Sequence, residues 1–287
     1  MLTQAVIEAA CRQALAEDVG RGDATTQAVV PEGLELSGTI VSREPCVCAG
    51  LEVAETVFRQ LNSAIAFEAG ADDGQSCQRG QILARVTGAA HAILTGERTA
   101  LNFLQRMSGI ATRTKEYVRA AGTNGTRILD TRKTTPGLRA LEKYAVVCGG
   151  GVNHRMGLYD RIMIKDNHRE IAALEGPGGL AAAIRRCREQ FPKLEIEVEA
   201  DTMEEVEIAA DAGVETILLD NMSNEEVASA VSAVAGRSLL EASGGITLDR
   251  IPALAETGVD FISVGALTHS APAVDIALDL DPVTHPA

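Results

Sequence analysis

The sequence contains no tryptophan, and only 3% of its 287 residues are aromatic. Its core must therefore be built mainly from aliphatic side chains, and the hydrophobic fraction of 46% is ordinary for a globular protein. The chain also lacks an apolar run near the roughly 18–20 residues that a membrane span needs. Its first residues carry Glu8 and Arg12 inside the apolar stretch and have no basic start, unlike a secretory signal. We expect no membrane partner and a cytoplasmic location.

Cysteine pairs at the spacing of metal ligands are absent as well. The six cysteines are scattered, only Cys46 and Cys48 are close together, and no C-x-x-C motif occurs. This pattern disfavours a structural zinc site and is typical of a protein in a reducing compartment.

Positive charge is scarce in most of the chain. There are 26 Lys and Arg against 40 Asp and Glu, which gives a formal net charge of −14. Such a chain repels the phosphate backbone, so we expect no nucleic-acid partner. Residues 127–169 are the exception, because they hold nine Lys and Arg against four acidic residues. The concentration of cations predicts a pocket for a small polyanion.

The first third of the sequence has the pattern of a small α+β domain. Helices are predicted over 3–17 and 51–61, and strands within 34–50 and 70–88, where glycines stand at turn spacing. A long helical pattern over 89–121 then connects this part to the rest of the chain.

From Thr126 onward, strands alternate with helices. The predicted strands are 126–130, 161–165, 195–199, 216–220, 239–243 and 261–265. The predicted helices are 137–149, 178–190, 202–212, 223–235 and 247–257. Repeated strand–helix units with apolar strands predict a parallel sheet covered by helices. Six units are fewer than the eight of a complete βα barrel, so the pattern leaves open a reduced barrel or an open sheet.

Polar or glycine residues stand at the carboxyl end of each predicted strand. These are Asp130 with Arg132 and Lys133, Lys165 with Asp166, Glu199, Asp220, Glu241 with Ser243, and Gly265. In βα barrels the carboxyl ends of the strands form the active-site face. The series therefore predicts a ring of functional side chains at one end of the sheet.

Glu199 and Asp220 are not needed as helix caps. Thr202 with Glu205, and Ser223 with Glu226, form better capping boxes three residues later. The two carboxylates are therefore free to point into the mouth of the barrel. There they would suit Mg²⁺, sugar hydroxyls or a developing positive charge.

The cations divide into two groups. Arg132, Lys133, Arg155 and Lys165 follow predicted strands or a glycine-rich loop and suit a ligand with several negative groups. A solvated helix face explains Arg139, Lys143, Arg161 and Arg169 in part.

Glycine runs supply further candidates for anion binding. Gly149–Gly151 is equally well explained as a helix end. The runs at 243–245 and 264–265 are better candidates for a phosphate site, because barrels often bind phosphate at their last two strands.

These residues alone leave three functions open. One is a transferase that joins two anionic substrates, and another is a Schiff-base lyase that uses Lys165. The third is an anion-binding module without catalytic activity.

The motifs resemble those of a known family. "NFLQRMSGIAT" (102–112), "DTRKTTPGLRALEKYAVVCGGGVNHRMGL" (130–158), "IKDNH" (164–168), "EVEA" (197–200), "LLDN" (218–221), "EASGGI" (241–246) and "VGALTHS" (264–270) occur in this order. Together they resemble quinolinate phosphoribosyltransferase, also called nicotinate-nucleotide diphosphorylase (carboxylating).

The resemblance implies an N-terminal α/β sandwich domain over 1–102 and an incomplete, about six-stranded parallel βα barrel over 103–270. Residues 271–287 would return to the first domain. It also implies a homodimer in which Arg98 acts across the interface.

The resemblance assigns a role to each matching residue. Quinolinate would be held by Arg132, His154, Arg155 and Lys165 with Arg98 of the other subunit. Lys133, Lys165, Glu199 and Asp220 would be catalytic: the lysines approach the diphosphate of phosphoribosyl pyrophosphate, and the carboxylates serve the ribose hydroxyls and Mg²⁺. Ser243, Gly244, Gly245 and Gly265 would bind the 5′-phosphate beside His269.

The implied reaction transfers phosphoribose to quinolinate with decarboxylation, giving nicotinate mononucleotide, pyrophosphate and CO₂ in NAD biosynthesis. A paralogous phosphoribosyltransferase-like protein with another anionic substrate is the alternative that the same resemblance leaves open.

Overall fold

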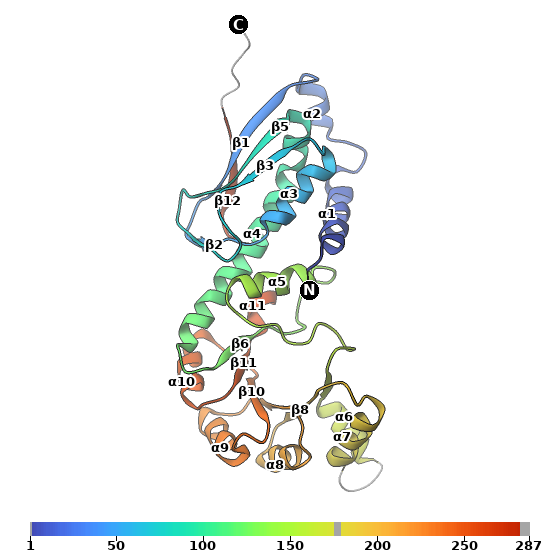
Figure 1. Ribbon diagram of the computed structural model, residues 1–287, viewed down its shortest axis with the longest axis vertical. Coiled ribbons are helices and arrows are strands. Elements are labelled where there is room, and N and C mark those ends of the chain that lie inside the picture. The colour runs from blue at the N-terminus through green and yellow to red at the C-terminus, as the bar shows by residue number, and fades with distance from the viewer. Residues whose placement is uncertain (1, 175–178, 282–287) are drawn as a thin grey trace. The chain divides into compact units, whose positions relative to one another are not determined.

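The computed structural model describes residues 2–174 and 179–281, and the chain divides into two compact units (Figure 1). The first unit takes the residues up to 115, 134–150 and those from 266 on; the second takes 116–133 and 151–265. The expected boundary between residues 102 and 103 falls inside a helix, α4 (Ala90–Ala121). That boundary stays a prediction.

The first unit contains a four-stranded antiparallel sheet with the order β12-β1-β5-β3. Its strands are β1 (Glu35–Ser42), β3 (Ala66–Ala69), β5 (Ile82–Ala89) and β12 (Ile276–Leu280). A separate pair is formed by β2 (Cys46–Val47) and β4 (Ser76–Cys77). Strand β12 pairs with β1, with Ile40 opposite Leu278. Residues 276–280 thus join the sheet of the first unit, whereas 282–287 lie outside the described residues.

Helices pack on this sheet, and α3 and the first part of α4 lie on one of its faces (Figure 1). Besides α4, the helices of this unit are α1 (Gln4–Val19), α2 (Ala24–Val29), α3 (Leu51–Leu61), α5 (Arg139–Cys148) and α11 (Ala266–His269). Helix α3 is amphipathic and buries Val53, Ala54, Val57 and Phe58. The sequence pattern missed the short elements α2, α11 and β3, which have few residues to carry a period.

Arg106 explains why α5 and α11 group with the first unit. Its guanidinium, on α4, donates to Glu142 Oε1 at 2.9 Å, to the Ala271 carbonyl at 2.9 Å and to the Thr268 carbonyl. Glu142 is only 1% exposed and also accepts from the Thr135 N–H at 3.0 Å. One ion pair, with its carboxylate buried, therefore ties three segments that are far apart in the sequence.

The second unit contains the six-stranded parallel sheet that the strand–helix alternation predicted. Its strands are β6 (Arg127–Leu129), β7 (Ile162–Ile164), β8 (Ile196–Ala200), β9 (Thr216–Asp220), β10 (Leu239–Ser243) and β11 (Phe261–Ser263). They are hydrogen-bonded in the order β6-β11-β10-β9-β8-β7. The first two strands in the sequence are therefore the two edges, and the sheet is an incomplete barrel with an open seam between β6 and β7.

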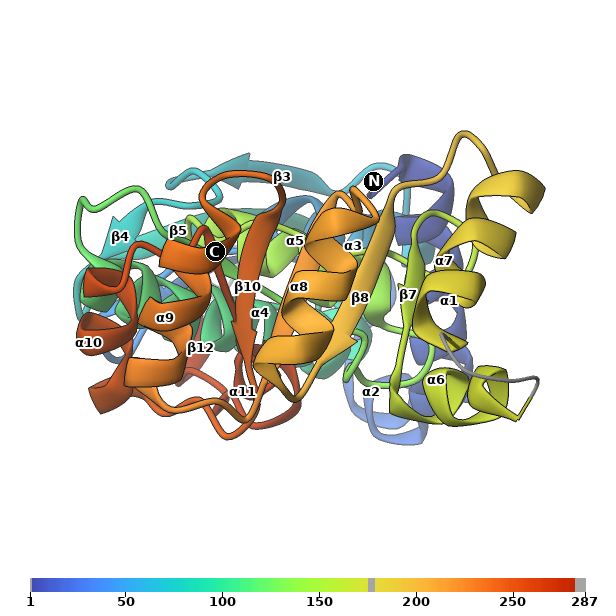
Figure 2. The same cartoon turned by 90° about the horizontal axis from the view of Figure 1, so that it is seen from below.

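Helices follow the strands and cover the sheet. They are α6 (Asp166–Ala173), α7 (Gly179–Gln190), α8 (Met203–Asp211), α9 (Asn224–Val234), the 3₁₀ turn η1 (Leu248–Arg250) and α10 (Ile251–Glu256). Figure 2 shows α8 and α9 on the outer face of the sheet. Thr202 and Ser223 cap these two helices in capping boxes, as predicted. Helix α6 was not predicted.

The segment 151–155 lies along the open seam. The Val152 N–H donates to the Ile128 carbonyl at 2.8 Å, and its carbonyl accepts from the Asp130 N–H at 3.2 Å. Val152 and Leu129 thereby form an isolated parallel bridge. The segment thereby pairs some of the backbone N–H and C=O groups at the free edge of β6, which would otherwise have no hydrogen-bond partner in the sheet.

Among residues 2–174 and 179–281, no helix combines the length and apolar character required to cross a membrane.

Gly109 permits a close backbone contact in the first unit. A Cβ at this position of α4 would stand 2.0 Å from the Pro272 carbonyl oxygen, and a backbone atom cannot move aside as a flexible side chain can. We predict that Gly109→Ala lowers the free energy of unfolding by about 1–3 kcal/mol, despite the better helix propensity of alanine. Urea unfolding measures this. The exposed α4 control Asn102→Ala should stay within about 0.5 kcal/mol of wild type; equal stability of both variants would contradict the contact.

Candidate active site

Most of the predicted site residues belong to the second unit. Its strands are all parallel, so their carboxyl ends meet at one edge of the sheet. The residues at or after these ends are Arg132, Lys133, His154, Arg155, Lys165, Glu199, Asp220, Ser243, Gly244, Gly245 and Gly265. Arg98 and His269 belong to the first unit, where both are exposed.

Lys165, Glu199 and Asp220 form one electrostatic group. The Lys165 Nζ lies 2.8 Å from Glu199 Oε2. Burial raises the pKa of Asp220, and the charges of Glu199 and Asp201 raise it further, while Lys165 and Lys133 oppose the shift. The four residues predicted as catalytic are thus close enough to influence one another. The acidic side of the group can accept a cation or a developing positive charge.

Arg132 and Arg155 gather positive charge in the same unit. Both guanidiniums are half-buried. Burial lowers the pKa of Arg155, and the nearby charge of Arg132 lowers it further. The Arg155 guanidinium donates to the Arg161 carbonyl at 3.2 Å and contacts Met163 Sδ at 3.4 Å. Two like charges held together in a partly desolvated place favour binding of an anion.

His154 is buried and faces two carboxyl groups from the strand layer. Its Nε2 lies 3.0 Å from Glu197 Oε2 and 3.5 Å from Glu241 Oε2. Its Nδ1 accepts from the Arg155 N–H at 2.6 Å. Burial lowers the pKa of His154, but the hydrogen bond and charge of Glu197 and the charge of Glu241 outweigh it and raise the pKa. Both ring nitrogens therefore have protein partners.

The turn after β10 is shaped by close packing. Gly244 has φ +88°, and a Cβ there would stand 2.1 Å from Asn221 Oδ1 and 2.8 Å from the Asn221 N. Asn221 also donates from Nδ2 to Asp220 Oδ2 at 2.6 Å. Only glycine fits at 244, and its backbone stays uncovered by a side chain, as a phosphate-binding turn requires.

Two of the cations predicted on a solvated helix face are in fact buried. Lys143 is 1% exposed, and Arg169 is 9% exposed and forms an ion pair with Asp201 at 2.6 Å and another with Glu205. The prediction was wrong for these two because the helical pattern does not show which neighbouring element supplies a partner. Arg139 and Arg161 are half-exposed.

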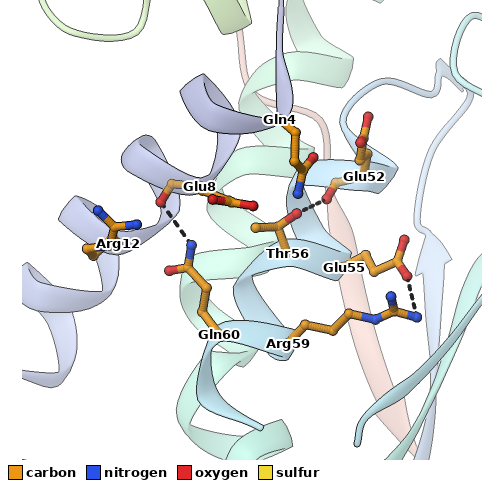
Figure 3. Close-up of a pocket in the computed structure, with 8 residues that line it drawn as sticks. All are labelled: Gln4, Glu8, Arg12, Glu52, Glu55, Thr56, Arg59 and Gln60. Carbon is orange, nitrogen blue, oxygen red and sulfur yellow. Dashed lines mark hydrogen bonds and ion pairs between the residues drawn. The ribbon is translucent and has the colours of Figure 1, made fainter. Parts of the chain in front are cut away.

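A cavity of about 610 Å³ lies between α1 and α3 of the first unit (Figure 3). It is lined by Gln4, Glu8, Arg12, Glu52, Glu55, Thr56, Arg59 and Gln60. Its polar groups largely satisfy one another: Arg59 pairs with Glu55 at 2.8 Å, and Gln60 Nε2 donates to the Glu8 carbonyl at 2.9 Å. It contains none of the predicted site residues, and size alone does not make it a site.

Most of the chain matches one family. The quinolinate phosphoribosyl transferase N-terminal domain matches residues 23–108, and the C-terminal domain of the same family matches residues 110–279. This chain belongs to the quinolinate phosphoribosyltransferase family.

Curated relatives and solved structures of the quinolinate phosphoribosyltransferase family cover nearly the full chain. A nicotinate-nucleotide pyrophosphorylase [carboxylating] of Mycobacterium leprae is 46% identical over 275 residues, 94% of this chain and 95% of the relative. A probable enzyme of the same name from Synechocystis is 42% identical over 281 residues, 96% of this chain and 92% of the relative. The crystal structure of NadC from Streptococcus pyogenes is 40% identical, with a TM-score of 0.93 and 99% coverage of both chains. The predicted fold class is thereby confirmed.

Sequence reasoning gave no role to Glu197 or Asn221, and placed Glu241 at a strand end. Glu241 instead lies in the middle of β10 and is 1% exposed. Strand alternation contained a signal for Glu197, because it stands two residues before Glu199 and so shares its face of the strand. Nothing in the sequence alone marks Asn221 as the neighbour of Gly244.

The buried cluster makes a pH prediction. Burial, then the charge of Glu197, raise the pKa of Glu241 to about 8. An unfolded carboxyl titrates near 4.3, so from about pH 4.5 to about pH 8 the folded state keeps a proton that the unfolded state has lost, and stability falls as the pH rises. The raised pKa of His154 acts in the same direction. When the pH rises from about 5.5 to about 8, the free energy of unfolding should therefore fall less in Glu241→Gln than in wild type. The difference between the two decreases should be up to about 3 kcal/mol.

Urea unfolding at both pH values measures this difference. Glu225→Gln, an exposed substitution in the first turn of α9, should keep the wild-type pH dependence. An unchanged pH dependence in Glu241→Gln would mean that this carboxyl is ionised in the folded protein.

Proposed function

We propose that this chain transfers the phosphoribosyl group of phosphoribosyl pyrophosphate to the ring nitrogen of quinolinate, with decarboxylation. The products are nicotinate mononucleotide, pyrophosphate and CO₂, in NAD biosynthesis. The relatives named nicotinate-nucleotide pyrophosphorylase [carboxylating] support the proposal. The observation that carries it is that the second unit holds both two mutually repelling guanidiniums, of Arg132 and Arg155, and the acidic Lys165–Glu199–Asp220 group.

The positive side of this arrangement would bind quinolinate. Arg132 and Arg155 suit its two carboxylates, because a guanidinium can grip a carboxylate in a bidentate fork. Lys165 and His154 complete the proposed set within the chain. Holding the dianion beside a second anionic substrate would remove much of the barrier that their mutual repulsion imposes.

The acidic side would stabilise the reacting sugar. As the bond from the anomeric carbon to pyrophosphate breaks, positive charge develops on the ribose, and Glu199 and Asp220 oppose it with negative charge. The quinolinate nitrogen lone pair forms the new bond. Lys133 and Lys165 would neutralise the departing pyrophosphate, and the backbone at Ser243, Gly244, Gly245 and Gly265 would bind the 5′-phosphate.

Decarboxylation follows from the quaternised nitrogen. When the bond between the ring and the 2-carboxylate breaks, its electron pair stays on the ring carbon beside the positive nitrogen. That carbon then takes a proton from water.

Mg²⁺ is proposed at Glu199 and Asp220. The raised pKa of Asp220, due to burial and then to Glu199 and Asp201, indicates excess negative charge that a divalent cation would relieve. Carboxylate oxygens are also the ligands that Mg²⁺ prefers. When bound, the ion would supply charge neutralisation for the diphosphate.

We also propose a homodimer in which Arg98 acts on the partner's substrate. Arg98 is exposed on α4, and among the described residues it has no ion pair or hydrogen bond that would occupy its guanidinium. A cytoplasmic location stays a prediction.

The direct test mixes protein, phosphoribosyl pyrophosphate, Mg²⁺ and quinolinate and measures nicotinate mononucleotide. Nicotinic acid replaces quinolinate in a parallel reaction. We expect at least about 100-fold lower kcat/KM for nicotinic acid, because one carboxylate leaves part of the cationic set unpaired. Excess EDTA should suppress the quinolinate reaction.

Two results would contradict the proposal. Comparable turnover of both acids would exclude a pocket built for two carboxylates, and no nicotinate mononucleotide at all would exclude the reaction. Undiminished turnover in EDTA would remove Mg²⁺ from the proposal and leave the rest.

Arg132 and Arg155 can be tested separately. We predict that Arg132→Ala or Arg155→Ala weakens quinolinate binding by about 1.5–3 kcal/mol, the cost of one lost charged hydrogen bond. Isothermal titration calorimetry with quinolinate alone measures this. Lys193→Ala removes an exposed cation outside the site and should bind as wild type. Wild-type affinity in both arginine variants would place the carboxylate pocket elsewhere.

A further inference from the structure

Three polar side chains, those of Glu197, Glu241 and His154, lie inside the strand layer. The proposed reaction gives none of them a role at the ribose or the pyrophosphate. Glu197 is 0% exposed, Glu241 is 1% exposed, and His154 is 8% exposed. The strands of covered parallel sheets are usually apolar, and a buried carboxyl group costs stability unless it is well paired. Packing alone therefore does not account for the cluster.

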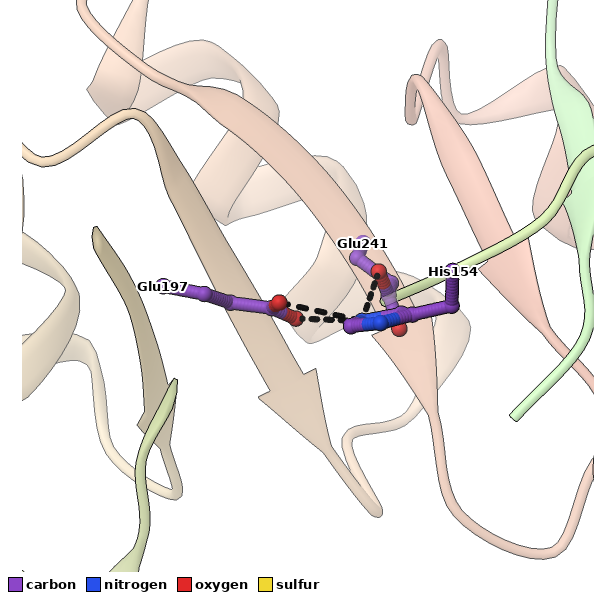
Figure 4. Close-up of side chains that lie close together, drawn as sticks. All are labelled: His154, Glu197 and Glu241. Carbon is purple, nitrogen blue, oxygen red and sulfur yellow. Dashed lines mark hydrogen bonds and ion pairs between the residues drawn. The ribbon is translucent and has the colours of Figure 1, made fainter. Parts of the chain in front are cut away.

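The two glutamates approach His154 from different strands, β8 and β10 (Figure 4). Glu197 places both oxygens near Nε2, at 3.0 and 3.2 Å, and Glu241 lies 3.5 Å from the same nitrogen. The side chain of Arg161 stands 3.7 Å from Glu197 and balances part of the negative charge. The ring is thus held by two strands, β8 and β10, neither of which borders the seam.

His154 belongs to the segment 151–155, which lies along the open edge of β6. Its backbone N–H donates to Asp130 Oδ1 at 2.8 Å, and Asp130 is fully buried. Its Nδ1 accepts from the Arg155 N–H at 2.6 Å. The ring therefore connects the seam segment to β8 and β10 through one nitrogen and to the backbone of Arg155 through the other.

Arg155 is fixed at its other end by the opposite edge of the seam. Its guanidinium donates to the carbonyl of Arg161, directly before β7, and contacts Met163 in β7. Within the described part of the chain, no carboxylate forms an ion pair with Arg155. Its charge is therefore available to an anion, and its place depends on the two anchors.

Resting on the proposed function, we propose that Glu197 and Glu241 are positioning residues for quinolinate binding. By holding the His154 ring inside the strand layer, they fix the segment 151–155 and aim Arg155 at a carboxylate of the substrate. Neither glutamate touches the substrate in this proposal. A metal ion held by the same three side chains is the competing explanation, because their ligand atoms lie within 4.8 Å of one another.

The test uses Glu241→Gln and Glu197→Gln, which keep side-chain volume, with the exposed Glu225→Gln as control. Steady-state kinetics in the full-length protein, measured at about pH 9, above the pKa of about 8 of the Glu241 carboxyl, should give a KM for quinolinate raised about tenfold in both cluster variants. The KM for phosphoribosyl pyrophosphate should stay within about twofold of wild type, and Glu225→Gln should match wild type for both substrates.

A double-mutant cycle shows whether the glutamate acts through Arg155. If it does, adding Glu241→Gln to Arg155→Ala should raise the quinolinate KM by less than about twofold, because the group it positions is already gone. Multiplicative effects would overturn the proposal. So would equal changes in both KM values, or failure of both glutamine variants to fold, since each indicates a general structural role.

Elemental analysis of the purified wild-type protein decides the competing explanation. One equivalent of a metal that is lost in Glu241→Gln would replace the positioning role with a metal site. If wild-type protein makes no nicotinate mononucleotide, the proposed function fails by itself. If wild type is active and both glutamine variants keep its quinolinate KM, only the positioning proposal fails.

Discussion

The parallel direction of six strands is the constraint on which the candidate site depends. Parallel strands place all their carboxyl ends at one edge, so residues from six distant stretches of sequence meet there without any loop being long. Lys165 and Glu199, which follow or end neighbouring strands β7 and β8, form an ion pair for this reason. The same geometry gives Asp220 its acidic neighbours and raises its pKa.

Charge at this edge is arranged in opposition rather than uniformly. The chain as a whole is acidic, yet the guanidiniums of Arg132 and Arg155 are close enough to repel each other. On the acidic side, the carboxylates of Asp220 and Glu199 repel each other in the same way. Such local excesses of each sign cost stability in the empty protein and are relieved by ligands of the opposite sign. The ion pair of Lys165 with Glu199 also bears on the Schiff-base alternative, because nucleophilic attack by the Lys165 amine would first require its contact with the carboxylate to break.

The sequence predicted the parallel strands well because each is a short, mostly apolar run within a repeated strand–helix alternation. Thr202 and Ser223 indicated where two helices begin, so Glu199 and Asp220 were not needed as helix caps and could be predicted as site residues. The seam was not predictable, because strand order depends on pairing between distant segments, and neither was the burial of Lys143 and Arg169. The cluster around His154 escaped for a similar reason: Glu197, Glu241 and His154 are separated by more than forty residues along the chain at each step.

The pairing of β12 with β1 has a consequence for biosynthesis. Strand β12 follows the entire second unit in the sequence, so a ribosome delivers every barrel strand before it delivers this one. Until then β1 has a partner only on its β5 side, and its other edge carries unpaired backbone groups. The first unit therefore leaves the ribosome with an unpaired, aggregation-prone edge on β1 while the rest of the chain is translated. Binding of a chaperone to that edge would favour the later pairing of β12 with β1.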